Sequence, residues 1–174
     1  NAIHLAAEFI GALRDIQAEL AENGNQDEDY DVSYTTIHAG KISGGVALNI
    51  VPNQCTIDFE IRNLACDDAS AILDQIQNAA NVIVADMDHP NAGIEIEVFN
   101  TYPGLDTPQG SAVVDFVKSL TGTNGTMKVA FGTEAGLFDQ RLGVPCVVCG
   151  PGSMAQGHKP DEFIEADQLR ACDA

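Results

Sequence analysis

The sequence predicts a mixed α/β (α+β) protein in two parts, a ferredoxin-like sandwich over residues 1–106 and a βα segment over residues 107–174. Helical apolar stripes alternate with strand-like patterns in the first part, and a turn-rich hinge then precedes a different pattern. The chain has 174 residues, of which 45% are hydrophobic. This is enough for one ordinary domain or for two small ones that share a core.

The first element is an amphipathic helix. Apolar side chains recur on one helical face at steps of four, three and four residues, namely Phe9, Leu13, Ile16 and Leu20. Gly24 is a C-terminal stop signal. The polar, acidic residues 25–31 are typical of an exposed loop, and strand character follows over residues 32–42.

A second strand and a second helix follow. From Cys55 to Arg62 apolar and polar residues alternate, so Arg62 is expected to point away from the core. Asp67 or Asp68 is expected to cap a helix whose apolar stripe reaches Met87 and which ends before His89. Residues 94–98 alternate again, as a half-buried strand does.

The order α-β-β-α-β is a ferredoxin-like sandwich without its opening strand. That strand would lie between the strands ending near Arg62 and near Phe99, so we expect the gap to be closed by direct pairing, by strand exchange or by a retained peptide. Two helices are expected on one face of the sheet. The residues expected to be buried there include Phe59, Ile61, Ile72, Ile76, Ile83 and Ile96.

The pattern changes to βα alternation after the turn-rich hinge at residues 101–108. We expect, in order, a helix, a strand, a helix, a buried strand and a last helix, at residues 110–120, 127–131, 134–141, 144–149 and from 165 onward. This segment is too short to be an α/β domain by itself.

Charge and cysteine content narrow the class of protein. The formal charge of −18 repels nucleic acid and anionic membranes. No apolar run reaches the roughly 20 residues that span a bilayer, and the first residues lack the basic start of a signal peptide, so a cytoplasmic protein is expected. Five cysteines, an odd number, favour reduced thiols, and Cys146-x-x-Cys149 is interpreted as apolar filling rather than a redox or metal motif.

Three strings resemble the lid and the final catalytic segments of the dinuclear zinc aminoacylase and carboxypeptidase family: Asn49–Pro52 leading to Phe59–Arg62, Phe131–Phe138, and Gly150–Pro160. The resemblance covers essentially the whole chain. It implies that residues 1–106 are a lid domain that forms a homodimer and that residues 107–174 return to a catalytic domain. It also implies two zinc ions per site, with cobalt as a possible substitute.

The resemblance places most of the catalytic groups upstream of Asn1, so no catalytic residue is assigned here and the 174-residue chain alone is expected to be inactive. His158, in Gln-Gly-His-Lys-Pro, is the expected metal ligand, since a neutral imidazole after a glycine-rich turn is a common zinc ligand. Without the family strings, a surface-loop histidine would be the simpler interpretation. A single ligand binds zinc only weakly.

Arg62 is expected to clamp the substrate carboxylate, with Asn49 as a neighbouring amide donor, because a planar guanidinium binds a carboxylate with two parallel hydrogen bonds. In the family these lid groups act on the partner subunit's site. The alternative is a solvated strand arginine paired with Glu60 or Glu95, which stabilises by less than about 1 kcal/mol.

The turn Gly132–Thr133–Glu134 is expected to bind the α-carboxylate of an amino acid, as helix N-termini bind anions, and Glu134 a basic side chain. The alternative is that Thr133 caps the helix and Glu134 is an ordinary first-turn acid. Gly152 and Ser153 are expected to shape the floor near His158 by close backbone approach.

The reaction that the resemblance implies is hydrolysis of an N-acyl amino acid, in which a metal-bound water attacks an amide carbonyl polarised by zinc. The sequence leaves open whether the substrate carries an acetyl group, a succinyl group or another acyl group, or is a dipeptide. An alternative of another class is a ferredoxin-like small-molecule-binding or dimerisation module. Residues 107–174 argue against it, because such a module has no use for half of a βα layer.

Overall fold

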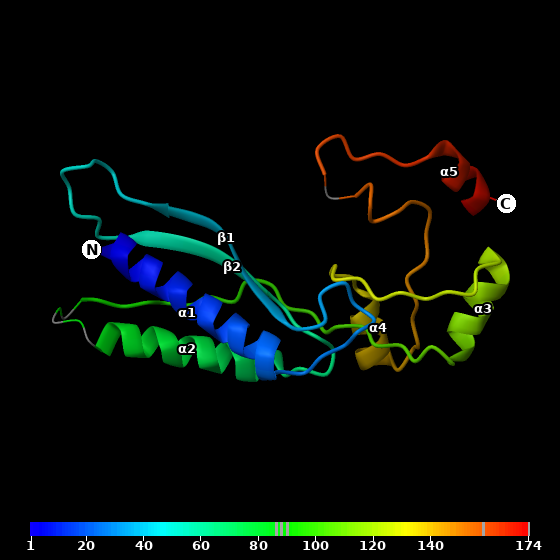
Figure 1. Ribbon diagram of the computed structural model, residues 1–174, viewed down its shortest axis with the longest axis horizontal. Helices are drawn as coiled ribbons and strands as arrows, with labels where there is room; N and C mark the ends of the chain where they lie inside the picture. Colours follow the sequence, from blue (N-terminus) through cyan, green and yellow to red (C-terminus); the bar gives the residue numbers. More distant parts are fainter. Residues whose placement is uncertain (86, 88, 90, 158, 174) are drawn as a thin grey trace. The chain divides into compact units, whose positions relative to one another are not determined.

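The computed structural model describes residues 1–85, 87, 89, 91–157 and 159–173 (Figure 1). The chain forms two compact units. Unit 1 comprises Asn1–Asp106 and Thr126–Thr133, and unit 2 comprises Thr107–Gly125 and Glu134–Ala174. Helices together with an antiparallel sheet confirm the predicted mixed α/β (α+β) class.

Helix α1, Ala2–Asn23, opens unit 1. The Asn1 side chain caps it by accepting a hydrogen bond from the Ile3 N–H at 3.0 Å. The helix ends as predicted at Gly24, where a Cβ atom would lie 2.4 Å from the Leu20 carbonyl oxygen. The absence of a side chain at this position therefore lets the chain leave the helix.

Strands β1, Thr36–Gly44, and β2, Cys55–Arg62, form an antiparallel hairpin. The bounds of β2 are those expected, whereas β1 begins and ends later than the predicted residues 32–42. The register pairs Ile37 with Ile61 and Ala39 with Phe59, and it shifts between Ala39 and Lys41, as in a β-bulge.

Helix α2, Ala69–Ala85, follows an aspartate cap. Asp68 accepts hydrogen bonds from the Ser70 and Ala71 N–H groups at 2.9 and 3.4 Å, and the bond from the Ser70 hydroxyl contributes most to lowering the pKa of Asp68. Asp67, the other candidate cap, accepts a hydrogen bond from the Thr35 hydroxyl instead. The helix ends before His89 as predicted, but it stops short of Met87.

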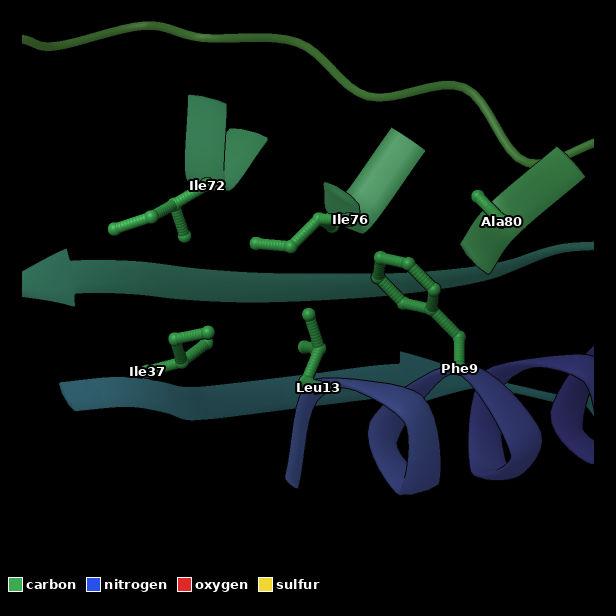
Figure 2. Close-up of a cluster of buried hydrophobic side chains, with 6 residues drawn as sticks. All are labelled: Phe9, Leu13, Ile37, Ile72, Ile76 and Ala80. Carbon is green, nitrogen blue, oxygen red and sulfur yellow. The ribbon is translucent and has the colours of Figure 1, made fainter. Parts of the chain in front are cut away.

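Six buried side chains from both helices and β1 form the core of unit 1, namely Phe9, Leu13, Ile37, Ile72, Ile76 and Ala80 (Figure 2). Helix α1 contacts both strands and α2, and Figure 1 shows both helices on the same side of the hairpin, as predicted. Of the side chains expected to be buried, Ile72 and Ile76 are buried. The others, half-buried around this core, are Phe59, Ile61, Ile83 and Ile96.

The strand expected at residues 94–98 does not join the sheet. Ile94 and Ile96 are half-buried and alternate with exposed Glu95 and Glu97. Within the described part of the chain, however, the sheet consists of β1 and β2 alone. Alternation fixes which face a side chain occupies, but a strand also needs a neighbour about 4.8 Å away. Direct pairing of 94–98 with β2 is therefore a wrong prediction, while strand exchange and a retained peptide remain predictions.

Unit 2 contains the three helices expected: α3, Ala112–Thr121, α4, Ala135–Leu142, and α5, Ala166–Cys172. The strands predicted at 127–131 and 144–149 are not present. Val144 and Val148 are each 49% exposed, so the expected burial of 144–149 is wrong. The physical reason is that an apolar run forms a buried strand only where neighbouring strands and covering layers exist.

Candidate functional site

Arg62 lies at the end of β2 on its exposed face, as the alternation predicted. Its Nε lies 2.8 Å from a carboxylate oxygen of Glu60, and its Nη1 donates a hydrogen bond to the Ala130 carbonyl at 2.6 Å. The side chain is 48% exposed, so the ion pair with Glu60 contributes at most about 1 kcal/mol to stability. The guanidinium thus stays accessible to a ligand.

Asn49 is exposed in the loop between β1 and β2, within a turn in which the Ile50 N–H donates to the Ala47 carbonyl at 3.1 Å. Arg62 is at the opposite end of the hairpin. Strand β2 alone spans roughly 20 Å at about 3.3 Å per residue. Within one chain, the expectation that Asn49 and Arg62 are neighbours is therefore wrong. The loop that carries Asn49 lies at one end of the hairpin and Arg62 lies at the other.

The side chains around Asn49 are apolar and exposed. We call residues 46–51 the apolar loop. Its exposed side chains, with their exposed fractions, are Val46 (90%), Leu48 (107%), Ile50 (55%) and Val51 (72%). A hydrogen bond from the Ala2 N–H to the Pro52 carbonyl at 2.9 Å ties the end of this loop to the start of α1.

Residues 126–133, which we call the returning segment, belong to unit 1 although unit 2 precedes and follows them in sequence. A Cβ atom at Gly132 would lie 1.7 Å from the Tyr102 hydroxyl, so only glycine fits beneath this ring. Glu134 occupies the N-cap position of helix α4, but its side chain makes no capping hydrogen bond. The alternative in which Thr133 is the N-cap is thus wrong, because the helix starts one residue later.

Lys128 in the returning segment was not identified as a site residue from the sequence. Its Nζ lies 2.7 Å from Asp27 and 2.6 Å from Asp106, and 5.6 Å from the centre of the Tyr30 ring. Burial lowers the pKa of Lys128, but the hydrogen bonds to Asp106 and Asp27 outweigh it and raise the pKa overall. No local pattern signals these contacts, since Asp27 is separated from Lys128 by 101 positions.

The glycine-rich loop belongs to unit 2. Gly152 has φ +106°, a conformation that favours glycine, and its N–H donates to the Gln168 side chain at 3.4 Å. Ser153 opens a turn in which its carbonyl accepts from the Gln156 N–H at 2.9 Å. His158 lies outside the described residues.

Among the residues that the structure describes, no group of three or more histidine, cysteine, aspartate or glutamate side chains is placed to hold a metal ion. The five cysteines are free; Cys146 is half-buried and Cys149 is exposed. No described helix is long and apolar enough to cross a membrane. Of the candidate site residues in unit 1, Arg62 and the returning segment are joined by a hydrogen bond, and Asn49 is not close to them.

Comparison with known proteins adds independent evidence. A family model described as "Peptidase dimerisation domain" matches residues 1–88. Proteins named acetylornithine deacetylase are similar over nearly all of the chain. The protein from Myxococcus xanthus is 29% identical over 174 residues, which are 100% of this chain and 44% of the relative.

Two further relatives of the same name are similar to a comparable extent. The protein from Photorhabdus laumondii subsp. laumondii is 32% identical over 95% of this chain and 41% of its own length. The protein from Shigella sonnei is 33% identical over 95% of this chain and 42% of its own length. The chain thus spans less than half the length of the curated relatives it matches. Since the family model covers half of its residues, the chain belongs to the M20 family of peptidase dimerisation domains.

Proposed function

We propose that the full-length protein containing this chain is a metal-dependent N-acyl-amino-acid deacylase that hydrolyses N-acetylornithine to ornithine and acetate, a reaction of arginine biosynthesis. The names of the relatives, which are 29–33% identical, support this assignment. The observation that carries it is the hydrogen bond between Arg62 and the Ala130 carbonyl. It places an accessible guanidinium beside the segment that leads to Gly132 and Thr133.

In this proposal Arg62 binds the α-carboxylate of the substrate, because a guanidinium offers two parallel donors to a carboxylate. Gly132 and Thr133 contribute backbone N–H groups to the carboxylate, and Thr133 also supplies a hydroxyl next to the N-terminus of α4. Glu134 contacts the basic side chain of the ornithine moiety. Gly152 and Ser153 shape the floor of the site near His158.

The proposed metal is zinc, with cobalt as a substitute. The described residues do not provide a set of three ligands by themselves, so the remaining ligands would come from outside this part of the chain, together with His158. Metal analysis of the purified full-length protein and of His158→Ala tests this assignment. We expect close to two zinc ions per wild-type subunit and a lower content in the variant.

The protein is further proposed to be a cytoplasmic homodimer that pairs through residues 1–106. The description of the matching family as a dimerisation domain supports this, and so does the exposed apolar loop. A dimer also gives Asn49 a role despite its distance from Arg62, since it would serve the partner subunit's site. Leu48→Asp in the full-length protein should shift the mass measured by light scattering from dimer towards monomer.

The activity is tested by measuring release of the free amino acid from N-acetylornithine, N-succinyl-diaminopimelate and other N-acyl amino acids. We expect the full-length protein to show its highest kcat/KM with N-acetylornithine. Highest kcat/KM with the succinyl substrate would instead assign a desuccinylase. No turnover of any amide would favour a small-molecule-binding module.

The same assay applied to the 174-residue chain alone should detect no turnover, even with added zinc or cobalt. An activated water needs about three fixed protein ligands and a general base. Turnover by the chain alone that survives repurification and is lost in His158→Ala would show that the active site is contained within these residues.

A further inference from the structure

The returning segment depends on side-chain contacts for its place in unit 1. The chain passes between the units after Asp106, after Gly125 and after Thr133, so unit 2 flanks this segment on both sides. Residues 126–133 form no helix or strand. No regular backbone ladder therefore holds the segment, and individual contacts must fix its position.

Lys128 makes the strongest of these contacts. Its ammonium donates to one carboxylate on the loop after α1, Asp27, and to one at the end of the hinge, Asp106, at 2.7 and 2.6 Å. The Lys128 and Asp27 side chains are each 24% exposed, which limits screening by water and salt. Its backbone N–H also donates to the Asp29 carbonyl at 3.4 Å. One residue thus joins three separate stretches of unit 1.

Few other cations in this chain could neutralise Asp27 and Asp106 in place of Lys128. The chain carries 26 acidic side chains against eight lysines and arginines. Removing the ammonium would leave the Asp27 and Asp106 carboxylates close together without a counter-charge, and like charges at such a distance repel. A neutral residue at position 128 would therefore release the segment from both carboxylates, and the carboxylates would move apart.

The contacts of the segment recur at every second residue. Lys128 is followed by Ala130, whose carbonyl accepts from Arg62, and then by Gly132, which lies against the Tyr102 ring. A shift of the segment by one residue would break all three contacts. The position of Lys128 thus fixes the register in which Gly132 precedes the turn into α4.

We propose that Lys128 is a positioning residue for the substrate-carboxylate site: by pairing with Asp27 and Asp106 it fixes the returning segment and hence the location of Gly132 and Thr133. This proposal rests on the function proposed above. Lys128 itself does not contact the substrate. Its effect is on how well the carboxylate is recognised and on the mobility of the segment.

The kinetic test compares Lys128→Met, Lys128→Arg and Lys41→Met in the full-length protein. Lys41 is the matched control, since its side chain is 83% exposed and its ammonium lies 3.8 Å from the Asp58 carboxylate. With N-acetylornithine, Lys128→Met should raise KM about tenfold with kcat changed less than about threefold. Lys128→Arg should restore most of the loss, and Lys41→Met should stay within about twofold of wild type.

A substrate analogue separates positioning from a general loss of folded enzyme. Wild type should prefer N-acetylornithine over its α-carboxamide analogue, and Lys128→Met should reduce that preference. A merely structural role would lower the amount of active enzyme and leave both KM and the preference unchanged. That result would overturn the proposal, whereas a wild type without any preference for the carboxylate would overturn the proposed function of the turn itself.

Hydrogen exchange measured by mass spectrometry supplies a readout that needs no activity. Peptides that contain the Lys128 amide, which donates to the Asp29 carbonyl, should exchange about tenfold faster in Lys128→Met than in wild type, while peptides from β2 should be unchanged. Unchanged exchange of 126–133 would overturn the proposal regardless of the kinetics. If Lys128→Met does not fold, Asp106→Asn takes its place, because it removes one of the two ion pairs. The same changes in KM, in substrate preference and in hydrogen exchange are then expected.

Discussion

The two units of this chain contain similar apolar patterns but bury them very differently. Among the described residues, Val114 is the buried apolar side chain of unit 2, and the other eight buried apolar side chains lie in unit 1. In unit 1 the hairpin and two helices supply two layers that enclose a core. Among the described residues of unit 2 there are three short helices, and large side chains such as Phe116 and Leu142 stay exposed.

The strand-like runs show why this difference arises. Strand β2 forms because β1 precedes it in sequence and pairs with it antiparallel, so a local hairpin satisfies its backbone. Residues 144–149 are as apolar as β2, yet no described strand lies beside them. An apolar pattern alone therefore does not bury a segment. Burial also requires a neighbouring layer of secondary structure that packs against it.

Truncation of the unit 1 core should produce the largest effect. Ile76 is 0% exposed at the centre of the cluster. Ile76→Ala should lower the free energy of unfolding by about 2–5 kcal/mol, because it removes buried methyl groups and leaves a cavity. Urea denaturation followed by circular dichroism measures the change. A loss below about 1 kcal/mol would mean that the core relaxes freely and that the contrast between the units is smaller than their burial indicates.

The next largest effect is expected from Arg62→Ala, which changes the proposed substrate site and leaves the buried core intact. Arg62→Ala in the full-length protein should lower kcat/KM for N-acetylornithine. The expected loss of transition-state stabilisation, calculated from the ratio of the two kcat/KM values, is about 2–4 kcal/mol, because a substrate carboxylate loses its charged partner. The melting temperature should barely change, since the Glu60 pair is exposed. If kcat/KM stays within about twofold of wild type while the melting temperature falls, Arg62 is a structural strand residue.

Much of unit 1 was predictable from sequence because its determinants are local. The alternation from Cys55 to Arg62 specified β2 and the outward direction of Arg62, and Asp68 specified the start of α2. The pairing of Lys128 with Asp27 was not predictable, since it joins residues far apart in the chain. The position of Tyr102 over Gly132 escaped prediction for the same reason.

Acid should weaken the contact between Lys128 and its carboxylates. The hydrogen bond from Lys128 lowers the pKa of Asp27 below the ordinary value of 3.8. The stabilisation is therefore fully present above pH 3.8 and is lost as the pH falls through the lowered pKa. Wild type should melt at a higher temperature than Asp27→Asn at pH 6, and this difference should shrink progressively as the pH falls below 3.8. Asp167→Asn, at a side chain that is 95% exposed, is the control and should leave the melting temperature at pH 6 almost unchanged.

The smallest effect is expected in α5, where no residue is buried. Leu169 is 46% exposed, so Leu169→Ala should change the unfolding free energy of the 174-residue chain by less than about 0.5 kcal/mol, although the same kind of truncation is costly in a core. The same substitution in the full-length protein distinguishes two explanations of this exposure. A loss of about 2 kcal/mol there would show that a further layer covers α5, because only a buried leucine contributes on this scale. An equally small loss in both forms would show that the exposed helix is intrinsic to unit 2, and the contrast between the units would then belong to the full-length protein as well.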